Sequence, residues 1–282
     1  MVVFSSIMAF MLTTGFEDYE DKWWRILLLF AGGMLVTGSA NAINQVVEKD
    51  TDAIMKRTGS RPVASGRMSS TEGWVFALCT GLPGVVILGN GFNWLAAGLA
   101  AFSLFLYAFI YTPLKKVSSM AVLVGAFPGA LPCLIGWAAG EGSLTLGGWI
   151  LFTIQFLWQF PHFWAIAWVA HKDYTTAGFR LLPADQGPTK FTALQTVIYS
   201  LLLLPVTVLP FFIGGRDYAA ISSFRDLKGM FSLALILGAN LFMLMRCIRL
   251  YREMDVAAAR RVMFGSYIYL PVILLALLMS KI

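Results

Sequence analysis

The chain has 282 residues, of which 58% are hydrophobic and only 13% are charged, and its mean hydropathy is +0.73. Because soluble domains carry about 25% charged residues, this composition excludes an ordinary soluble enzyme, and the long apolar runs exclude a disordered chain. The three cysteines lie far apart in the sequence, which argues against a disulfide scaffold or a zinc site. The net charge of +6 comes from basic residues in short loops between apolar runs, a pattern typical of membrane orientation and not of nucleic-acid binding.

Apolar segments of about 20 residues, long enough to cross a bilayer, follow one another along the chain. Glycine, proline and charged residues separate them, so we predict an all-α bundle of nine transmembrane helices that forms a single domain over residues 1–282. The predicted spans are 1–14, 24–43, 73–90, 93–112, 119–138, 145–168, 194–214, 229–249 and 264–281. The first is short and has neither the basic start nor the cleavage site of a signal peptide. We therefore expect a chain that begins partway into its first helix, with shallow insertion as the alternative.

Lys and Arg are distributed unequally between the two sides of the predicted bundle. The loops after the second, fourth, sixth and eighth spans hold 15 of the 21 basic residues, and the opposite side holds 6. Because cytoplasmic loops are enriched in Lys and Arg, we predict that these loops and the amino terminus face the cytoplasm. The polar residues best suited to chemistry lie in the same loops, so the bundle is expected to carry a cytoplasmic polar cap with the active face.

The second span leads into a polar stripe made of Asn44, Glu48 and Asp52, which are spaced four residues apart. If the helix continues through them, they form one face about 12 Å long. Two carboxylates and an amide oxygen suit Mg²⁺, which proteins often hold with one or two carboxylates and substrate phosphates. Arg57 and Arg61 follow, and their guanidinium groups match phosphate oxygens. The alternative is a helix that simply ends in solvated charges at the membrane surface.

His162 lies inside the sixth span, next to Pro161. An ionisable side chain inside a membrane is costly to insert, so His162 is a candidate functional residue. The competing interpretation is a hydrogen bond to the backbone group that Pro161 leaves free. Nearby aromatic residues could line a channel and stabilise a cation, although packing against lipid is the default for such residues. They are Trp137, Trp158, Phe160, Phe163 and Trp164.

Three segments carry a family resemblance. The loop after the second span reads Asn44-Gln45-x-x-Glu48-x-x-x-Asp52, residues 111–140 begin Tyr-Thr-Pro-Leu-Lys-Lys, and residues 160–183 begin Phe-Pro-His-Phe-Trp. In this order they resemble the UbiA superfamily of intramembrane prenyltransferases, whose first motif is Asn-Asp-x-x-Asp-x-x-x-Asp. Gln45 and Glu48 depart from that motif in a way that is similar to the branch that farnesylates protohaem IX. The last three spans match only in apolar character.

The resemblance implies transfer of a farnesyl group from farnesyl diphosphate to a vinyl group of protohaem IX (haem B), giving haem O and diphosphate, with Mg²⁺ as cofactor. It implies a multi-pass protein of the bacterial cytoplasmic membrane that hands its product to a haem A synthase or a terminal oxidase assembly. The implied catalytic residues are Asn44, Glu48, Asp52, Lys172 and Asp173, and the first three are the implied metal ligands. The implied substrate-binding residues are Arg57, Arg61, Lys115, Lys116 and His162.

The loop after the sixth span departs from the superfamily. Its Asp-x-x-x-Asp motif aligns with residues 170–174, where only Asp173 is acidic, so two protein-held Mg²⁺ ions are in doubt and Lys172 could neutralise diphosphate directly. A solvated surface pair is the alternative for Lys172 and Asp173.

Two other functions stay open. A prenyltransferase acting on an aromatic quinone precursor would be expected to keep the acidic motifs. A transporter more often has inverted repeats, with charges near the membrane midplane.

Overall fold

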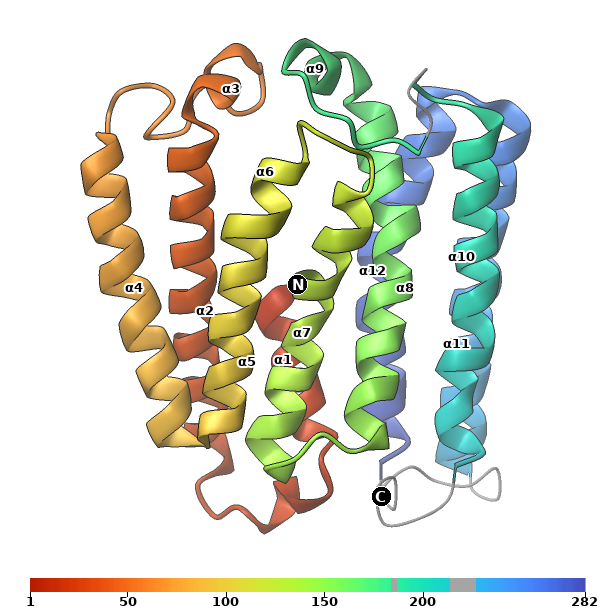
Figure 1. The fold of residues 1–282 in the computed structure, drawn as a ribbon. Helices are drawn as coiled ribbons and strands as arrows, with labels where there is room; N and C mark the ends of the chain where they lie inside the picture. Colours follow the sequence, from red (N-terminus) through yellow and green to blue (C-terminus); the bar gives the residue numbers. More distant parts are fainter. Residues whose placement is uncertain (184–186, 214–226, 282) are drawn as a thin grey trace.

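The computed structural model describes residues 1–183, 187–213 and 227–281, and across them the regular secondary structure is helical (Figure 1). Position 214 of the seventh predicted span, Arg216 and Arg225 lie outside the described residues. The long helices are α2 Lys22–Val47, α4 Ser70–Gly91, α5 Trp94–Phe105, α7 Ala121–Glu141, α8 Leu146–Val169, α10 Lys190–Val208, α11 Leu227–Glu253 and α12 Val256–Met279. The shorter elements are α1 Val2–Met11, η1 Thr14–Asp18, α3 Lys49–Ile54, the π-helical η2 Leu106–Tyr111, α6 Thr112–Leu114, α9 His171–Thr176 and η3 Leu209–Phe211.

Eight helices among the described residues are long and apolar enough to cross a membrane, with α5 counted through to Leu114. This confirms the predicted all-α membrane bundle. α1 differs from the other predicted spans, because its 10 residues rise only about 15 Å, half the thickness of the hydrocarbon core. α12 begins at Val256, well before the predicted position 264. Asp255 caps it there by accepting a hydrogen bond from the backbone N–H of Ala258 at 2.6 Å.

The long helices stand side by side, and α3 and α9 cover one end of the bundle, which we call the cap (Figure 1). α8 packs against α7, α10 and α12, and α7 also packs against α1 and α5, so α7 and α8 are central. Large apolar side chains stay exposed on the outer helices, among them Trp23, Leu82 and Trp94. Such an extensive exposed apolar surface fits contact with lipid. The cap therefore closes one end of a bundle whose sides face the membrane.

Side chains of two neighbouring helices bind the backbone of α7. Pro132 has no N–H to donate to the carbonyl oxygen of Pro128, and Ser103 Oγ of α5 donates to that oxygen instead at 3.1 Å. Gln155 Nε2 of α8 donates to the carbonyl oxygen of Gly129 at 2.6 Å. These bonds fix α5 and α8 against α7 in the middle of the bundle, where no water competes for them.

α1 packs against α2, α7 and α12 and closes the bundle between them. Gly136 of α7 allows the two helices α1 and α7 to approach closely, since an added Cβ there would lie 1.8 Å from the carbonyl oxygen of Ser6 in α1. At the other end of the helix, Lys281 Nζ donates to the carbonyl oxygens of Met11 and Thr13, each at 2.8 Å. Lys281, two residues after α12, thus satisfies carbonyls that a helix end leaves free. α1 is part of the wall of the bundle.

Gly136→Ala tests the close approach of α1 and α7. The added methyl group would collide with the backbone of α1, so we expect the free energy of unfolding to fall by about 1–3 kcal/mol, measured as a lower melting temperature in detergent. Gly98→Ala in α5 is the control, because an added Cβ there has nothing within 4 Å and alanine favours a helix. Equal melting temperatures for the two variants would contradict this packing.

Candidate functional site

A polar cavity of about 230 Å³ lies against α3 and α9, the two helices of the cap. Its wall comes from the end of α2, from α3 and the loop after it, from η2 and from α9. Six of the ten residues predicted for the site line it: Asn44, Glu48, Asp52, Arg57, Arg61 and Lys115. The fold therefore brings together residues from two separate segments of the sequence.

Glu48 interrupts the helix at the centre of the polar stripe. α2 ends at Val47 and α3 begins at Lys49, with Glu48 between them at φ −97° and ψ 13°. Backbone hydrogen bonds nevertheless continue across the break, from the N–H of Glu48 to Asn44 at 2.9 Å and from the N–H of Asp52 to Glu48 at 2.7 Å. The stripe is bent where a continuous helix was expected, but its three side chains still line one cavity.

Lys115 reaches the stripe from the segment that follows α6. Its Nζ lies 2.9 Å from Glu48 Oε1 and 3.1 Å from Asn44 Oδ1, and Asn44 Nδ2 donates to Glu48 Oε2 at 2.8 Å. All three side chains are buried. Burial lowers the pKa of the Lys115 ammonium, and the Glu48 carboxylate opposes that shift. The result is a closed set of hydrogen bonds that fixes a carboxylate, an amide and an ammonium group at the cavity wall.

Two arginines add positive charge to the wall of the cavity. Arg61 Nη1 lies 2.8 Å from Oδ2 of Asp52, which is 1% exposed. Arg57 Nη2 donates to the Tyr174 hydroxyl at 3.1 Å, and burial raises the pKa of that tyrosine, which keeps it neutral. With Lys115, three cations line the cavity beside two carboxylates. The net positive charge suits an anionic ligand such as a phosphate ester.

Tyr107 and Tyr111 form the border of the polar cavity on its membrane side. Both come from η2, and π-helical turns are frequent at functional sites. Their ring centroids are 5.4 Å apart, and Lys115 Nζ lies 4.6 Å from the Tyr111 centroid. Gly125 of α7 leaves room for Tyr111, since an added Cβ would lie 2.5 Å from its ring. Neither tyrosine was predicted as a site residue, although their four-residue spacing, continued by Lys115, was the available signal.

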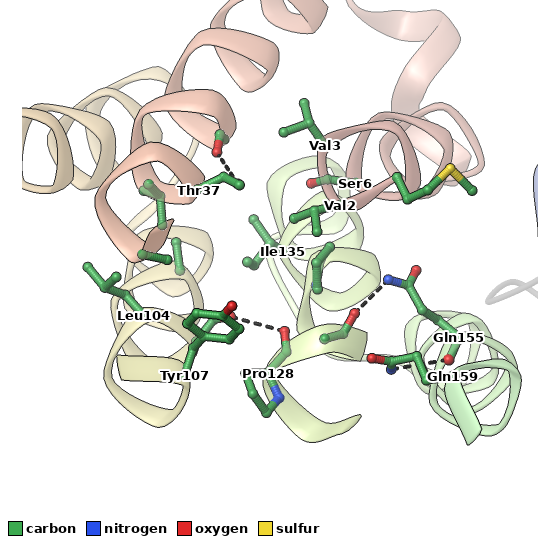
Figure 2. Close-up of a pocket in the computed structure, with 18 of the residues that line it drawn as sticks. Val2, Val3, Ser6, Thr37, Leu104, Tyr107, Pro128, Ile135, Gln155 and Gln159 are labelled. Carbon is green, nitrogen blue, oxygen red and sulfur yellow. Dashed lines mark hydrogen bonds between the residues drawn. The ribbon is translucent and has the colours of Figure 1, made fainter. Parts of the chain in front are cut away.

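An apolar cavity of about 390 Å³ lies inside the bundle (Figure 2). α1, α2, α4, α5, α7, α8 and α12 contribute to its wall. Figure 2 shows Tyr107 on one side of it and Gln155 and Gln159 of α8 on the other. Tyr107, Tyr111 and Phe163 line this cavity and the polar one. A molecule with an anionic head and an apolar tail can therefore occupy both cavities at once.

His162 lines the apolar cavity and not the polar one. Its Nδ1 lies 2.7 Å from Ser266 Oγ of α12, so its hydrogen bond is with another helix and not with the backbone beside Pro161. Of the five aromatic residues noted in the sequence, Trp158 and Phe163 line the same cavity, and the other three pack in the hydrophobic core. The imidazole is thus available to a molecule inside the bundle.

Besides His162, three predicted residues lie outside the lining of the polar cavity. Lys116 is exposed and lines a neighbouring cavity of about 460 Å³ together with His171 and Arg180. Lys172 is exposed on α9, and Asp173 beside it is partly exposed. Their roles stay predictions.

The donor set of the stripe fits a hard divalent cation. Asn44, Glu48 and Asp52 offer oxygen atoms only, which is the ligand type that Mg²⁺ prefers. In the part of the chain that the structure describes, no three His, Cys, Asp or Glu side chains form a closed metal cage. A cation held by these residues therefore keeps positions for phosphate oxygens and water, the usual mode of Mg²⁺ in proteins.

The sequence matches the model of the UbiA prenyltransferase family over residues 2–269. It is 41% identical over 281 residues to the protoheme IX farnesyltransferase of Cytophaga hutchinsonii, an alignment that covers 100% of this chain and 93% of that protein. It is also 41% identical to the protoheme IX farnesyltransferase of Flavobacterium johnsoniae, with 99% of this chain and 90% of that protein covered.

Two solved structures share this fold. A structure of digeranylgeranylglyceryl phosphate synthase matches with a TM-score of 0.76 at 19% identity, covering 99% of this chain and 92% of that one. A UbiA homolog from Archaeoglobus fulgidus bound to GPP and Mg²⁺ matches with a TM-score of 0.67 at 13% identity, covering 98% and 96%. At such low identity these likenesses concern the fold alone.

A double-mutant cycle tests the ion pair between Glu48 and Lys115 by comparing the stability losses of the single and double variants. Lys115→Met leaves the carboxylate buried without its ammonium partner, so we expect the free energy of unfolding to fall by about 3–5 kcal/mol. Glu48→Gln should also destabilise, but the double variant should lose less than the sum of the two, because it leaves no charge unpaired. Melting curves of the four proteins in detergent give the comparison. Additive losses would show that the two groups do not interact.

Proposed function

Because the chain belongs to the UbiA prenyltransferase family, we propose that it transfers a farnesyl group from farnesyl diphosphate to a vinyl group of protohaem IX, giving haem O and diphosphate. Relatives that are 41% identical over nearly the whole chain bear the name protoheme IX farnesyltransferase, which supports this donor and acceptor. The observation that carries the proposal is the junction of a cation-lined cavity with an apolar one. Such a junction suits a diphosphate head and an isoprenoid tail.

Arg57, Arg61 and Lys115 are the proposed diphosphate ligands. Guanidinium and ammonium groups donate charge-assisted hydrogen bonds to phosphate oxygens, and all three residues line the polar cavity. Lys116 and Lys172 are exposed at the same end of the bundle. Their charge would raise the rate at which an anionic substrate reaches the cap.

Asn44, Glu48 and Asp52 are the proposed residues for holding Mg²⁺ against the diphosphate. When bound, the ion neutralises charge that develops on the leaving diphosphate. In the structure each carboxylate pairs with a cation, Glu48 with Lys115 and Asp52 with Arg61. Binding of a magnesium diphosphate would exchange these partners, so that the carboxylates hold the metal and the two cations turn to phosphate oxygens. The exchange keeps every buried charge paired.

The reaction starts with cleavage of the allylic C–O bond. The bonding electron pair goes to a diphosphate oxygen, and Lys115 with the two arginines stabilises the charge that develops there. The allylic cation forms at the border beside the rings of Tyr107 and Tyr111, whose faces attract positive charge. The vinyl group of the acceptor attacks this cation; water then adds to the new cation and loses one proton, which gives the hydroxyethylfarnesyl side chain. The apolar walls exclude bulk water from the allylic cation.

The cap is proposed to face the cytoplasm of a bacterial cell. The loops and helix ends on this side of the bundle hold 15 of the 21 basic residues, which by the positive-inside rule supports a cytoplasmic location. The similar proteins from Cytophaga hutchinsonii and Flavobacterium johnsoniae are bacterial, which supports the inner membrane. Farnesyl diphosphate would then enter from the cytoplasmic side.

Asp52→Asn tests the metal-binding role. The change removes one negative charge and keeps the shape of the side chain, so we expect conversion of haem B into haem O to fall at least about 100-fold. The assay uses purified protein in detergent with farnesyl diphosphate and Mg²⁺, and mass spectrometry of the extracted haem. Asp50→Asn is the matched control, because Asp50 lies on the same helix but is exposed outside the cavity. Full activity of Asp52→Asn would reject the role, and no haem O from the unmodified protein would reject the function.

Ser60→Cys tests the orientation. Ser60 is exposed in the loop that follows α3, and in a background without the three native cysteines an impermeant thiol reagent should modify it only from the cytoplasmic side. Glu20→Cys, exposed just before the start of α2, whose other end meets the cap, should react only from outside. The reverse pattern in intact cells and inverted vesicles would place the cap outside the cytoplasm.

A further inference from the structure

His162 and Ser266 form a buried pair between α8 and α12 at the wall of the apolar cavity. His162 Nδ1 lies 2.7 Å from Ser266 Oγ, and Ser266 Oγ donates its hydrogen to the carbonyl oxygen of Met263 at 2.6 Å. The hydroxyl thus binds the backbone of its own helix and the imidazole of another helix at the same time.

These two hydrogen bonds determine which imidazole nitrogen carries the proton. A serine hydroxyl has one hydrogen, and in Ser266 it is directed at Met263, so its oxygen accepts the bond from His162. Nδ1 is therefore the protonated nitrogen of the neutral ring, and Nε2 keeps its lone pair. Among the described residues, Ser266 is the group to which the imidazole is hydrogen-bonded. Nε2 is left for a molecule in the cavity.

Neighbouring aromatic rings hold the imidazole in this orientation. Trp158 stacks on it, with ring centroids 4.7 Å apart and an interplanar angle of 15°, and Trp158 Nε1 donates to the carbonyl oxygen of Ser266 at 2.8 Å. Tyr267 meets the imidazole edge to face at 4.8 Å. Rotating the ring would break the hydrogen bond and the stacking together. The lone pair is therefore pre-oriented before any ligand binds.

The cavity contains a second polar group without a partner. Ser6 on α1 is 5% exposed and lines the same cavity, and its Oγ has no hydrogen-bond partner among the described residues (Figure 2). No lining side chain of the described residues carries a full charge. The isoprenoid tail of the donor alone would leave both the Ser6 hydroxyl and His162 Nε2 unsatisfied, which buried polar groups rarely are. The cavity therefore suits a second occupant beside the tail, one that brings polar or Lewis-acidic atoms.

From this geometry we propose that His162 Nε2 is the axial ligand of the iron in the acceptor porphyrin, and that Ser266 is the positioning residue that sets its tautomer. The proposal rests on the proposed function, which supplies the porphyrin. Ligating histidines usually donate their other N–H to an oxygen acceptor, as His162 does to Ser266. Neutral imidazole is a common axial ligand of haem iron. Coordination would let the site select an iron porphyrin over a metal-free porphyrin or a small aromatic ring.

The test measures the ligation of the haem iron by spectroscopy. Haem is titrated into the purified full-length protein without farnesyl diphosphate, and absorbance and resonance Raman spectra report an iron–imidazole bond. The chain has two histidines, so His171→Ala on the cap is the matched control. We expect the bond in the unmodified protein and in His171→Ala. In His162→Ala we expect loss of the bond, a haem Kd raised at least about tenfold, and recovery of the spectrum with added imidazole.

Two further measurements distinguish iron ligation by His162 from a purely structural role: variants of Ser266, and titration with metal-free porphyrin. Ser266→Ala should weaken haem binding about tenfold and shift the iron–imidazole band, and Ser266→Thr, which keeps the hydroxyl, should restore both. Affinity for metal-free protoporphyrin IX should be the same in His162→Ala and the unmodified protein.

An unchanged iron–imidazole spectrum in His162→Ala, an equal loss of affinity for both porphyrins, or no haem binding by the unmodified protein would each overturn the proposal. Failure to form haem O is scored in the separate transfer assay, so the two proposals fail independently.

Discussion

The hydrogen bonds among Asn44, Glu48 and Lys115 hold the end of α2 against the segment that follows α6, and the polar cavity depends on them. A charge buried at the edge of a membrane is stable only when it is paired and hydrogen-bonded. Each member of this set satisfies the other two, so the set can stay buried. Because Lys115 also lies over the ring of Tyr111, the same bonds place the border between the two cavities.

The border separates two environments that prenyl transfer needs at neighbouring points. Ionisation of a diphosphate needs cations and a polar wall, and the allylic cation needs surroundings from which bulk water is excluded. The structure provides the first with Arg57, Arg61 and Lys115 and the second with the apolar interior of the bundle. Tyr107 and Tyr111 belong to both walls, so the change of environment occurs across one pair of aromatic rings. This need for two environments explains why these charged side chains lie at the cap end of the bundle and not in its apolar interior.

The sequence was sufficient for features that depend on local pattern and insufficient for those that depend on which helix faces meet. Apolar length predicted the membrane helices, and the four-residue spacing of Asn44, Glu48 and Asp52 predicted one polar face, because both are properties of one segment. The partners of these residues lie on other helices: Lys115 is 71 positions from Asn44, and Ser266 is 104 positions from His162. Hydropathy shows that a segment crosses the membrane but not which of its faces turns toward a given neighbour.

The early start of α12 shows a different limit, because Arg260 and Arg261 suggested a loop. The capping residue Asp255 was the signal that outweighed them, since an N-cap fixes where a helix begins whatever charges follow in its first turns. Lys172 and Asp173 show the converse. Their place in a motif predicted a role, but the exposed surface of α9 keeps them out of the lining of the polar cavity.

α8 connects the donor and acceptor parts of the site. Phe163 lines both cavities, and His162 is its neighbour on the same helix, so the proposed iron ligand lies beside the border at which the allylic cation is proposed to form. Ser266 and Trp158 hold the imidazole, while Asn44 and Lys115 hold the polar wall, and these two hydrogen-bonded sets share no residue. Donor and acceptor positions can therefore be fixed independently, and the distance between them is set by the rigid helices that carry them.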